Sequence, residues 1–286
     1  MSLLERNRYL LAQPFSKNVE TYVCPISKSK NEVSDGLKIA GGWRFFNELR
    51  VIQKKENVFS ESIMTPLKLI EEAKNESKEA LQEAENVIDS ITNKRLSFSN
   101  LNMSQPHIMG IINSTPDSFY KKSRSINSSF AIKKSNQMIS DGASIIDIGG
   151  ESSRPGAKKI SIEEEMQRVI PSIIDFKKNN LVTQISLDTR NLPTMKLGLE
   201  SGVDIINDIS GFEDHNKIKF VSKFNLPVIV MHMQNEPNNM QIEPKYSFAP
   251  IDIYKILSKR VNLLIQMGVN KSNIVVDPGI GFGKNI

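Results

Sequence analysis

Six short apolar segments in the second half of the chain constrain its fold more than any other feature. They are Ile108 to Ile112, Ser144 to Ile148, Gln184 to Leu187, Val203 to Ile206, Pro227 to Met231 and Ile274 to Val276. Helix-like segments lie between them, and strands without polar alternation are typical of sheets covered on both faces. The pattern predicts an α/β fold with parallel strands, either an open doubly wound sheet or a (β/α)8 barrel.

The residues that follow these segments favour the barrel. A doubly wound sheet usually carries a glycine-containing phosphate loop after its first strand, whereas Ile111 to Phe119 contains no glycine. A polar or ionisable residue instead follows each predicted strand: Asn113, Glu151 with Arg154, Asp188, Asn207 with Asp208, His232 and Asp277. In a barrel the carboxyl ends of all strands converge on one mouth, so we expect these residues to form a single active site there.

The chemistry of these residues suits a flat, nitrogen-rich heterocycle. A carboxylate accepts two parallel hydrogen bonds from an amino-pyrimidine edge, and an amide both donates and accepts. Arg154 suits an anion, while Met231 and Phe282 offer apolar walls. The residues therefore predict a pterin-like ring inside the barrel and a phosphate or carboxylate at its rim. The sequence has no zinc-ligand spacing and no nucleophile motif such as Gly-x-Ser-x-Gly.

Two longer segments resemble the signature segments of dihydropteroate synthases. They are I-M-G-I-I-N-S-T-P-D-S-F from Ile108 and G-A-S-I-I-D-I-G-G-E-S-S-R-P-G-A from Gly142. Four further blocks agree: I-S-L-D-T from Ile185, I-I-N-D-I-S-G from Ile205, V-M-H-M-Q from Val230 and D-P-G-I-G-F-G-K from Asp277. The resemblance implies a TIM (β/α)8 barrel of folate biosynthesis. Its reaction would condense 6-hydroxymethyl-7,8-dihydropterin pyrophosphate with p-aminobenzoate to give 7,8-dihydropteroate and pyrophosphate.

The resemblance also implies roles for individual residues. The pterin-binding residues would be Asp188, Asn207, Met231 and Asp277. The residues near p-aminobenzoate and the departing pyrophosphate would be Ser153, Arg154, Pro155 and Phe282. Asn113 would help to bind the pyrophosphate and its Mg²⁺, the cofactor that the resemblance implies. A pterin that loses pyrophosphate becomes cationic at its methylene, and nearby carboxylates would stabilise that charge.

The first loop departs from the family pattern. The family usually continues after Ser-Phe with a small residue and Asp-Gly-Gly, whereas Tyr120, Lys121, Lys122 and Ser123 follow here. Lys121 replaces an acid, and a cation near a developing carbocation raises the reaction barrier, so we expect a lower activity. Ser153 stands where the family commonly has Thr, a change that keeps the hydroxyl.

The sixth predicted strand lies close to Ile286, so we expect an incomplete barrel of about six of its eight βα units. The family's Ser-x-Lys and Arg-x-His segments, which contact the pterin and the pyrophosphate, have no counterpart here. Two interpretations stay open: a synthase, acting alone or completed by a second chain that supplies the missing strands, and a non-catalytic fragment of a split or decayed synthase gene. The Asn113 to Phe119 loop and Arg154 disfavour another pterin-binding barrel, such as a methyltetrahydrofolate-dependent methyltransferase.

The first hundred residues do not show this alternation of strand-like and helix-like segments. Residues 1–64 show no sustained periodicity, and no fold is assigned to this extension. Residues 65–100 are expected to hold a linker helix, because apolar residues recur at helical spacing from Pro66 to Thr92, with Thr65 as N-cap. One long amphipathic helix would thus precede the barrel, which would occupy residues 101–286.

Charge and composition exclude several classes of protein. The net charge of +5 is spread along the chain without basic runs, so we expect small-molecule substrates and no nucleic-acid surface. No apolar run is long enough to span a bilayer, and Cys24 is the single cysteine. The charged segment from Met1 to Arg8 is unlike a signal peptide, which favours a cytoplasmic protein.

Overall fold

The structure, a computed structural model, describes residues 13–26, 29–114, 124–152, 159–179, 183–237 and 239–284, the side chains of 124–130 excepted. The chain forms two compact units that divide near Leu96, and the first unit also includes Met103–Gln105. Each unit has a hydrophobic core of its own.

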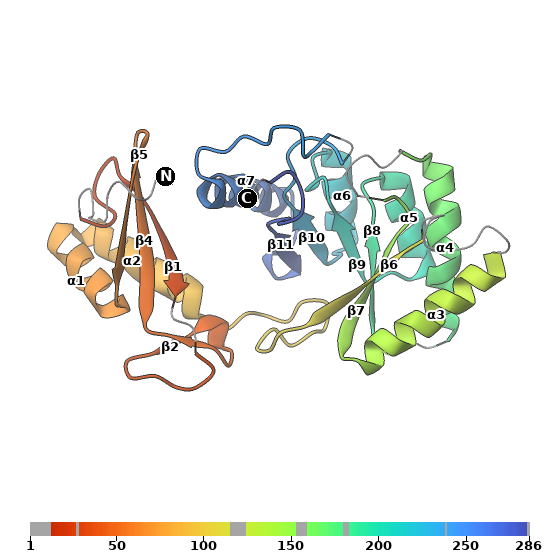
Figure 1. The fold of residues 1–286 in the computed structure, drawn as a ribbon, viewed down its shortest axis with the longest axis horizontal. Helices are drawn as coiled ribbons and strands as arrows, with labels where there is room; N and C mark the ends of the chain where they lie inside the picture. The colour runs from red at the N-terminus through yellow and green to blue at the C-terminus, as the bar shows by residue number, and fades with distance from the viewer. Residues whose placement is uncertain are drawn as a thin grey trace. The chain divides into compact units, whose positions relative to one another are not determined.

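A three-stranded antiparallel sheet forms the centre of the N-terminal unit. Its strands β1 (Glu20–Ile26), β4 (Glu48–Lys55) and β5 (Val58–Met64) lie in the order β1-β4-β5 (Figure 1). The short strands β2 (Leu37–Lys38) and β3 (Phe45–Phe46) pair with each other and flank the 3-10 helix η2 (Ile39–Gly41). Three consecutive residues of β4 are buried, which hides the alternation by which a strand is recognised in sequence.

Two helices, α1 (Pro66–Glu76) and α2 (Lys78–Thr92), complete this unit where the sequence predicts one long linker helix. Thr65 caps α1 as predicted. Ser77 then adopts an extended backbone and accepts a hydrogen bond from the Ala80 N–H at 3.0 Å, which ends α1 and begins α2. The helices share a core with the sheet, formed by Phe46, Leu49, Val51, Met64, Leu69, Ala73, Ala80 and Ala84. The linker interpretation is therefore corrected: these helices pack as part of a folded unit.

A six-stranded parallel sheet forms the second unit, as the apolar segments predict. Its strands follow one another in chain order: β6 (Ile108–Asn113), β7 (Ala143–Gly149), β8 (Gln184–Asp188), β9 (Ile205–Asp208), β10 (Val228–Met231) and β11 (Ile274–Asp277). The sheet is curled, with β6 and β11 at its edges (Figure 1). This order and curvature are those of consecutive units of a (β/α)8 barrel.

Helices cover one face of the parallel sheet. They are α3 (Arg124–Ser140), α4 (Ile162–Lys178), α5 (Leu192–Ser201), α6 (His215–Lys223) and α7 (Ala249–Gln266), with the 3-10 helix η3 (Lys271–Asn273) before β11. The core between sheet and helices includes Ile112, Ile146, Ile148, Leu187, Ile206, Val230, Ile173, Phe176, Met195 and Ile218. Because strand side chains alternate, the residues between these core positions lie on the opposite, concave face.

The parallel ladders align the carboxyl ends of the strands. The aligned residues are Asn113, Gly149, Asp188 and Asn207 across β6 to β9, and Met231 with Asp277 across β10 and β11. Residues that are far apart in the sequence thus reach one edge of the sheet.

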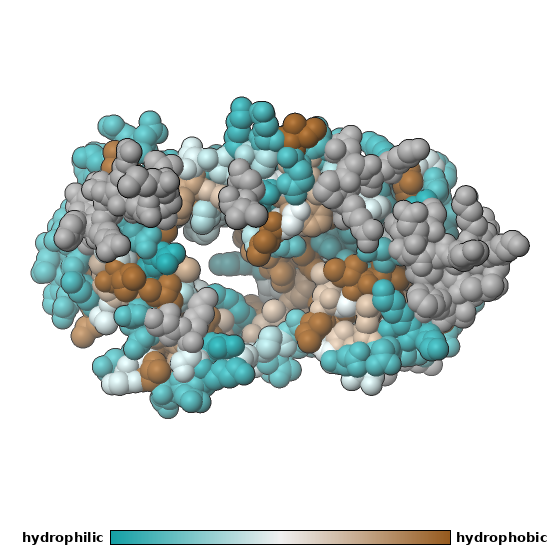
Figure 2. Space-filling model, in the orientation of Figure 1, coloured by the Kyte–Doolittle hydropathy of each residue, from teal (hydrophilic) through white to brown (hydrophobic). Residues whose placement is uncertain are grey.

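No helix among the described residues is both long and apolar enough to cross a membrane. Hydrophilic side chains and separate apolar patches share the surface that Figure 2 shows.

Candidate functional site

Three polar side chains from nearby strands meet at the carboxyl edge of the parallel sheet. Asn113 ends β6, Asp188 ends β8 and Asn207 lies in β9. Each lies on the concave face, because the preceding residue of its strand enters the helix-covered core. Asn207 is buried, Asp188 is partly exposed and Asn113 is exposed. The structure therefore brings together three residues that the sequence selects from separate segments.

Gly149 leaves room between two of these side chains. A Cβ atom at this position would lie 3.3 Å from Asp188 Oδ2 and 3.5 Å from Asn113 Oδ1. Both oxygens therefore face the space that a larger residue on β7 would fill. Glycine is suited to this strand end because it allows a ligand to approach the backbone between the two oxygens.

Asp188 is surrounded by other acids. Burial raises the pKa of the Asp188 carboxyl well above its usual range, and the charges of Asp147, Asp208, Glu165 and Glu151 raise it further. Asp188 accepts no hydrogen bond from any residue that the structure describes. A ligand that donates hydrogen bonds or carries positive charge would stabilise the ionised form, so the site favours such a ligand.

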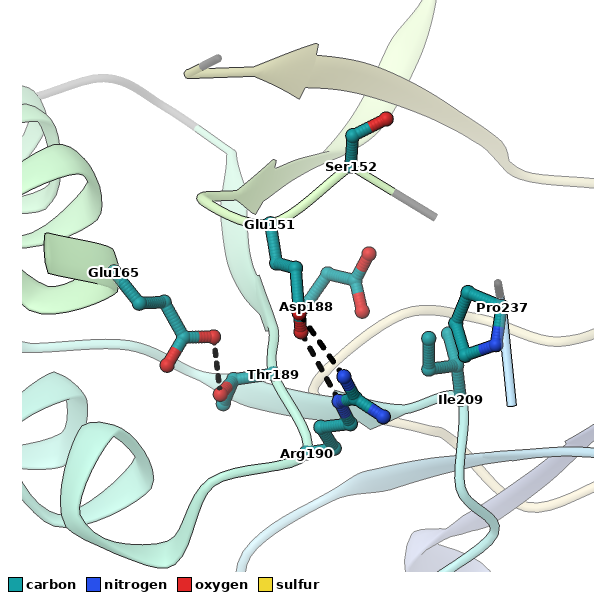
Figure 3. A pocket seen from close by; sticks show the side chains of 8 residues that line it. All are labelled: Glu151, Ser152, Glu165, Asp188, Thr189, Arg190, Ile209 and Pro237. Carbon is teal, nitrogen blue, oxygen red and sulfur yellow. Dashed lines mark hydrogen bonds and ion pairs between the residues drawn. The ribbon is translucent and has the colours of Figure 1, made fainter. Parts of the chain in front are cut away.

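Glu151 and Arg190 form a bidentate ion pair beside Asp188 (Figure 3). Arg190 Nε and Nη2 donate to the two Glu151 carboxylate oxygens, each at 3.0 Å. A small pocket opens here, lined by Glu151, Ser152, Glu165, Asp188, Thr189, Arg190, Ile209 and Pro237. Glu151 pairs with Arg190 and holds its guanidinium beside Asp188 in the loop after β8.

Two further acids near Asp188 have fixed partners. Lys217 Nζ donates to Asp208 Oδ2 at 2.6 Å, and the two side chains are only 5% and 0% exposed. Glu165 accepts three hydrogen bonds, from Thr189, Asn191 and Thr194 at 2.7, 3.0 and 2.5 Å. Asp188 is therefore the partly exposed acid of this cluster that is available to a ligand.

The loop after β11 is tied to the end of β10. Lys284 Nζ donates to the carbonyl oxygens of Gly279 and Phe282 at 2.6 and 2.7 Å, and lies 3.1 Å from His232 Nδ1. Burial and then the Lys284 charge lower the pKa of His232, so the imidazole is neutral and accepts from Lys284. Asp277 Oδ1 accepts from the Gly279 N–H at 2.7 Å. These contacts hold Asp277 and Phe282 at this end of the sheet.

Other predicted residues lie outside the described part of the chain. Ser153, Arg154 and Pro155 of the second signature segment are among them, as is Lys121 of the first loop. Their predicted roles stay predictions.

Sequence reasoning missed three polar residues of this unit. Asp147 lies within a strand that was interpreted as apolar, and a charged residue inside a strand buried on both faces was the available signal. Arg190 follows Asp188 by two residues, and Lys284 closes the glycine-rich block that begins at Asp277.

Asn113 is the residue that would hold the Mg²⁺ that the resemblance implies. Among the described residues, no group of three or more His, Cys, Asp or Glu side chains could hold a metal ion. Mg²⁺ commonly takes one or two protein oxygens and completes its shell with water and substrate phosphates. The Asn113 amide oxygen, which shares the Gly149 space with Asp188, fits that mode of binding, in which the substrate itself supplies ligands.

The fold and the site together define a class of protein. A curled parallel sheet with helices outside and acids and amides at the carboxyl ends of its strands is characteristic of barrel enzymes that bind a small organic ligand there. The sequence pattern of the family described as pterin binding enzyme matches residues 109–286. The chain belongs to this family.

Relatives of known activity are dihydropteroate synthases. The chain is 39% identical over 186 residues to the Haemophilus influenzae enzyme, covering 65% of this chain and 67% of the relative. The Yersinia pestis synthase, solved with a sulfonamide drug, aligns with a TM-score of 0.60 at 37% identity, covering 65% of this chain and 67% of that one. The Xanthomonas albilineans synthase, solved with 4-aminobenzoic acid, has a TM-score of 0.60 at 32% identity, covering 67% and 68%. The chain is also 39% identical over 188 residues to the Escherichia coli synthase, and it spans about two thirds of the length of this enzyme and of the Haemophilus influenzae one.

Proposed function

We propose that this chain carries the pterin site of a dihydropteroate synthase of folate biosynthesis. The reaction joins 6-hydroxymethyl-7,8-dihydropterin pyrophosphate to p-aminobenzoate and releases pyrophosphate. The observation that chiefly supports the proposal is the convergence of Asn113, Asp188 and Asn207 at one strand edge, in a chain of the pterin binding family.

In the proposed site, Asp188 is the main acceptor for the pterin. Its carboxylate would take two parallel hydrogen bonds from the amino-pyrimidine edge of the ring. These donors would offset the repulsion from neighbouring acids that raises the pKa of Asp188. Asn207 and Asp277 would add hydrogen bonds, and the Met231 thioether would pack on the face of the ring.

The pyrophosphate and the amine substrate would lie towards the rim. Asn113 would hold Mg²⁺ together with the substrate's pyrophosphate, and the bound ion would neutralise charge that develops on this leaving group. We propose Ser153, Arg154, Pro155 and Phe282 as the neighbours of p-aminobenzoate and of the departing pyrophosphate.

The proposed reaction breaks one bond and forms another at the same carbon. The C–O bond from the methylene to the pyrophosphate breaks, and its electron pair leaves with the pyrophosphate. The negative charge of Asp188, close to four other acids, would stabilise the cationic methylene conjugated with the ring. The amine nitrogen of p-aminobenzoate then forms the C–N bond and releases a proton.

We further propose that strands beyond these six complete the catalytic site. Both edge strands, β6 and β11, carry strongly exposed apolar side chains: Ile108, Ile111 and Val276 are 58%, 53% and 47% exposed. Unpaired edges with apolar residues are suited to pair with further strands. Those strands would come from the same or from a second polypeptide and would bring the remaining pterin and pyrophosphate ligands.

The test is a direct assay of the condensation. The full chain is mixed with both substrates and Mg²⁺, alone and together with the last third of the Escherichia coli enzyme, and 7,8-dihydropteroate is measured chromatographically. We expect turnover in the mixture that disappears when a chelator removes Mg²⁺. Calorimetry with 6-hydroxymethylpterin provides a second readout, in which Asp188→Asn should abolish binding and the exposed control Asp89→Asn should not.

The outcomes separate the two interpretations of the sequence. Pterin binding without turnover in every mixture would favour the non-catalytic one. If neither the chain nor the mixture binds the pterin, the proposed function is wrong.

A further inference from the structure

A second acid lies on the concave face, one layer below the site. Asp147 occupies the middle of β7, two residues before Gly149, and is only 3% exposed. Its strand neighbours Ile146 and Ile148 enter the helix-covered core, so the Asp147 side chain points to the concave side. Across the ladder it pairs with Ser186 of β8.

Asp147 contacts one member of the proposed pterin site. Asn207 Nδ2 donates a hydrogen bond to Asp147 Oδ2 at 3.3 Å. The other oxygen, Oδ1, is buried and has no hydrogen-bond partner among the described residues. Burial raises the pKa of Asp147, and the neighbouring Ser186 hydroxyl and Asn207 amide oppose that shift.

This arrangement does not favour the stability of the core. A buried acid with an unpartnered oxygen destabilises a fold relative to an apolar residue of similar size. Apolar residues are buried nearby in the same sheet: Ile145 precedes Asp147 by two residues in β7, and Ile205 begins β9. The position of the acid is therefore better explained by what it does to Asn207 than by stability.

A carboxylate below Asn207 fixes the direction of the amide. The two ends of an Asn side chain are similar in size, and only hydrogen bonding decides which end points where. The Asp147 oxygen that faces Asn207 accepts from Nδ2, so it selects the NH2 end. The carbonyl end, Oδ1, is then turned away from Asp147.

We propose that Asp147 is a positioning residue that orients the Asn207 amide so that its carbonyl oxygen is presented to the ring N–H donors of the pterin. The proposal rests on the proposed function and deepens it. Asp147 itself does not touch the ligand: it determines whether the site offers an acceptor or a donor at Asn207.

The first test replaces the acid with its own amide. In Asp147→Asn the volume is kept, but the new side chain can present either end to Asn207, so the orientation is no longer fixed. We expect binding of 6-hydroxymethylpterin to the full chain, measured by calorimetry, to weaken by about tenfold, the loss of one good hydrogen bond. Asp89→Asn, the exposed control acid of α2, should leave the affinity within about twofold.

The second test exchanges the two side chains. The double variant Asp147→Asn with Asn207→Asp restores a donor below and an acceptor above, so we expect it to bind the pterin more tightly than Asp147→Asn alone. In the reconstituted synthase, the KM for the pterin substrate should follow the same order, while the KM for p-aminobenzoate stays unchanged. A purely structural role predicts instead that the double variant is worse than either single change.

Thermal unfolding of each variant shows which ones fold. If Asp147→Asn does not fold, the exchange variant decides: pterin binding supports the proposal, and a folded exchange variant that fails to bind overturns it. If Asp147→Asn binds the pterin as tightly as the wild type does, the positioning role is wrong and the proposed function still stands. If the wild-type chain and its mixture with the Escherichia coli segment both fail to bind the pterin, the proposed function falls, and the positioning role with it.

Discussion

At the scale of single residues, the site concentrates negative charge that the folded chain only partly neutralises. Glu151, Asp208 and Glu165 have partners, whereas Asp188 depends on a ligand for its hydrogen bonds. Groups held in this way favour binding at the expense of stability, which is a common property of functional sites. Replacing the acid that lacks a partner should therefore lower the affinity and raise the stability.

Asp188→Asn should stabilise the ligand-free protein at neutral pH. The folded-state pKa of Asp188 is raised above its unfolded value, so its contribution to stability is fully present at low pH and is lost as the pH rises through the folded-state pKa. The amide does not undergo this loss. We expect the variant to be more stable than wild type by about 1 to 2 kcal/mol near pH 7.5, with the difference shrinking towards about pH 4.

Urea denaturation at several pH values measures this effect. Asp89→Asn, which changes an exposed acid of α2, should shift stability by less than about 0.5 kcal/mol at every pH. If Asp188→Asn is less stable than wild type at neutral pH, the interactions of the ionised Asp188 with its surroundings stabilise the fold more than burial and repulsion destabilise it, and the prediction is wrong.

Gly149→Ala should weaken ligand binding more than it weakens the fold. The added methyl would lie 3.3 and 3.5 Å from the Asp188 and Asn113 oxygens and would occupy the space that they face. Overpacking of this kind commonly costs about 1–3 kcal/mol. The same loss of binding free energy corresponds to about a tenfold or larger loss of pterin affinity, which calorimetry measures. Gly281→Ala is the matched control, because a Cβ there meets no atom within 4 Å. Equal affinities for both variants would contradict the proposed position of the ligand.

At the scale of elements, one lysine organises the loop that follows β11. Lys284 satisfies two carbonyl oxygens of the loop and contacts His232 beyond the end of β10. A loop held by a side chain in this way keeps its shape although it has no regular hydrogen-bond ladder.

Lys284→Met should loosen this loop and change the titration of His232. Loss of the donor removes the Lys284 hydrogen bonds to the Gly279 and Phe282 carbonyl oxygens, so we expect a destabilisation of about 1–3 kcal/mol by thermal or urea unfolding. The Lys284 charge contributes to the low pKa of His232, and its removal should raise that pKa, as followed by NMR. Lys245→Met changes an exposed lysine and should do neither. An unchanged His232 titration would refute the contact.

The elements differ in how well the sequence predicts them. The strands of the second unit were predictable because Ile146, Ile148 and their counterparts are buried on the helix side and interrupted by few polar residues. The first unit was not, since consecutive buried residues in β4 break the period of two. The break at Ser77 was hidden because a cap residue inside a periodic segment does not disturb the apolar spacing.

Site prediction divided along similar lines. Asp188, Asn113 and Asn207 could be named because each ends or nearly ends a predicted strand. Asp147 could not, since its importance depends on a cross-strand contact to a residue sixty positions away. Which of these acids form ion pairs or hydrogen bonds is likewise evident only from the folded structure.

At the scale of the whole molecule, two separate cores predict two unfolding events. Ser77→Ala removes the cap of α2 in the first unit and should lower one calorimetric transition by the equivalent of about 1 kcal/mol. Lys284→Met should lower only the other. Ser90→Ala, which changes an exposed hydroxyl of α2, serves as the control. A single transition that both variants shift equally would show that the units unfold as one.

The strand order of the parallel sheet also bears on how the chain is made. Each strand pairs with the one synthesised just before it, since the order from β6 to β11 is the order of the sequence. No strand needs to wait for a distant partner, so the sheet can grow unit by unit as the polypeptide leaves the ribosome. During this growth the most recently added strand has an unpaired edge, and a chaperone that shields nascent chains would bind there.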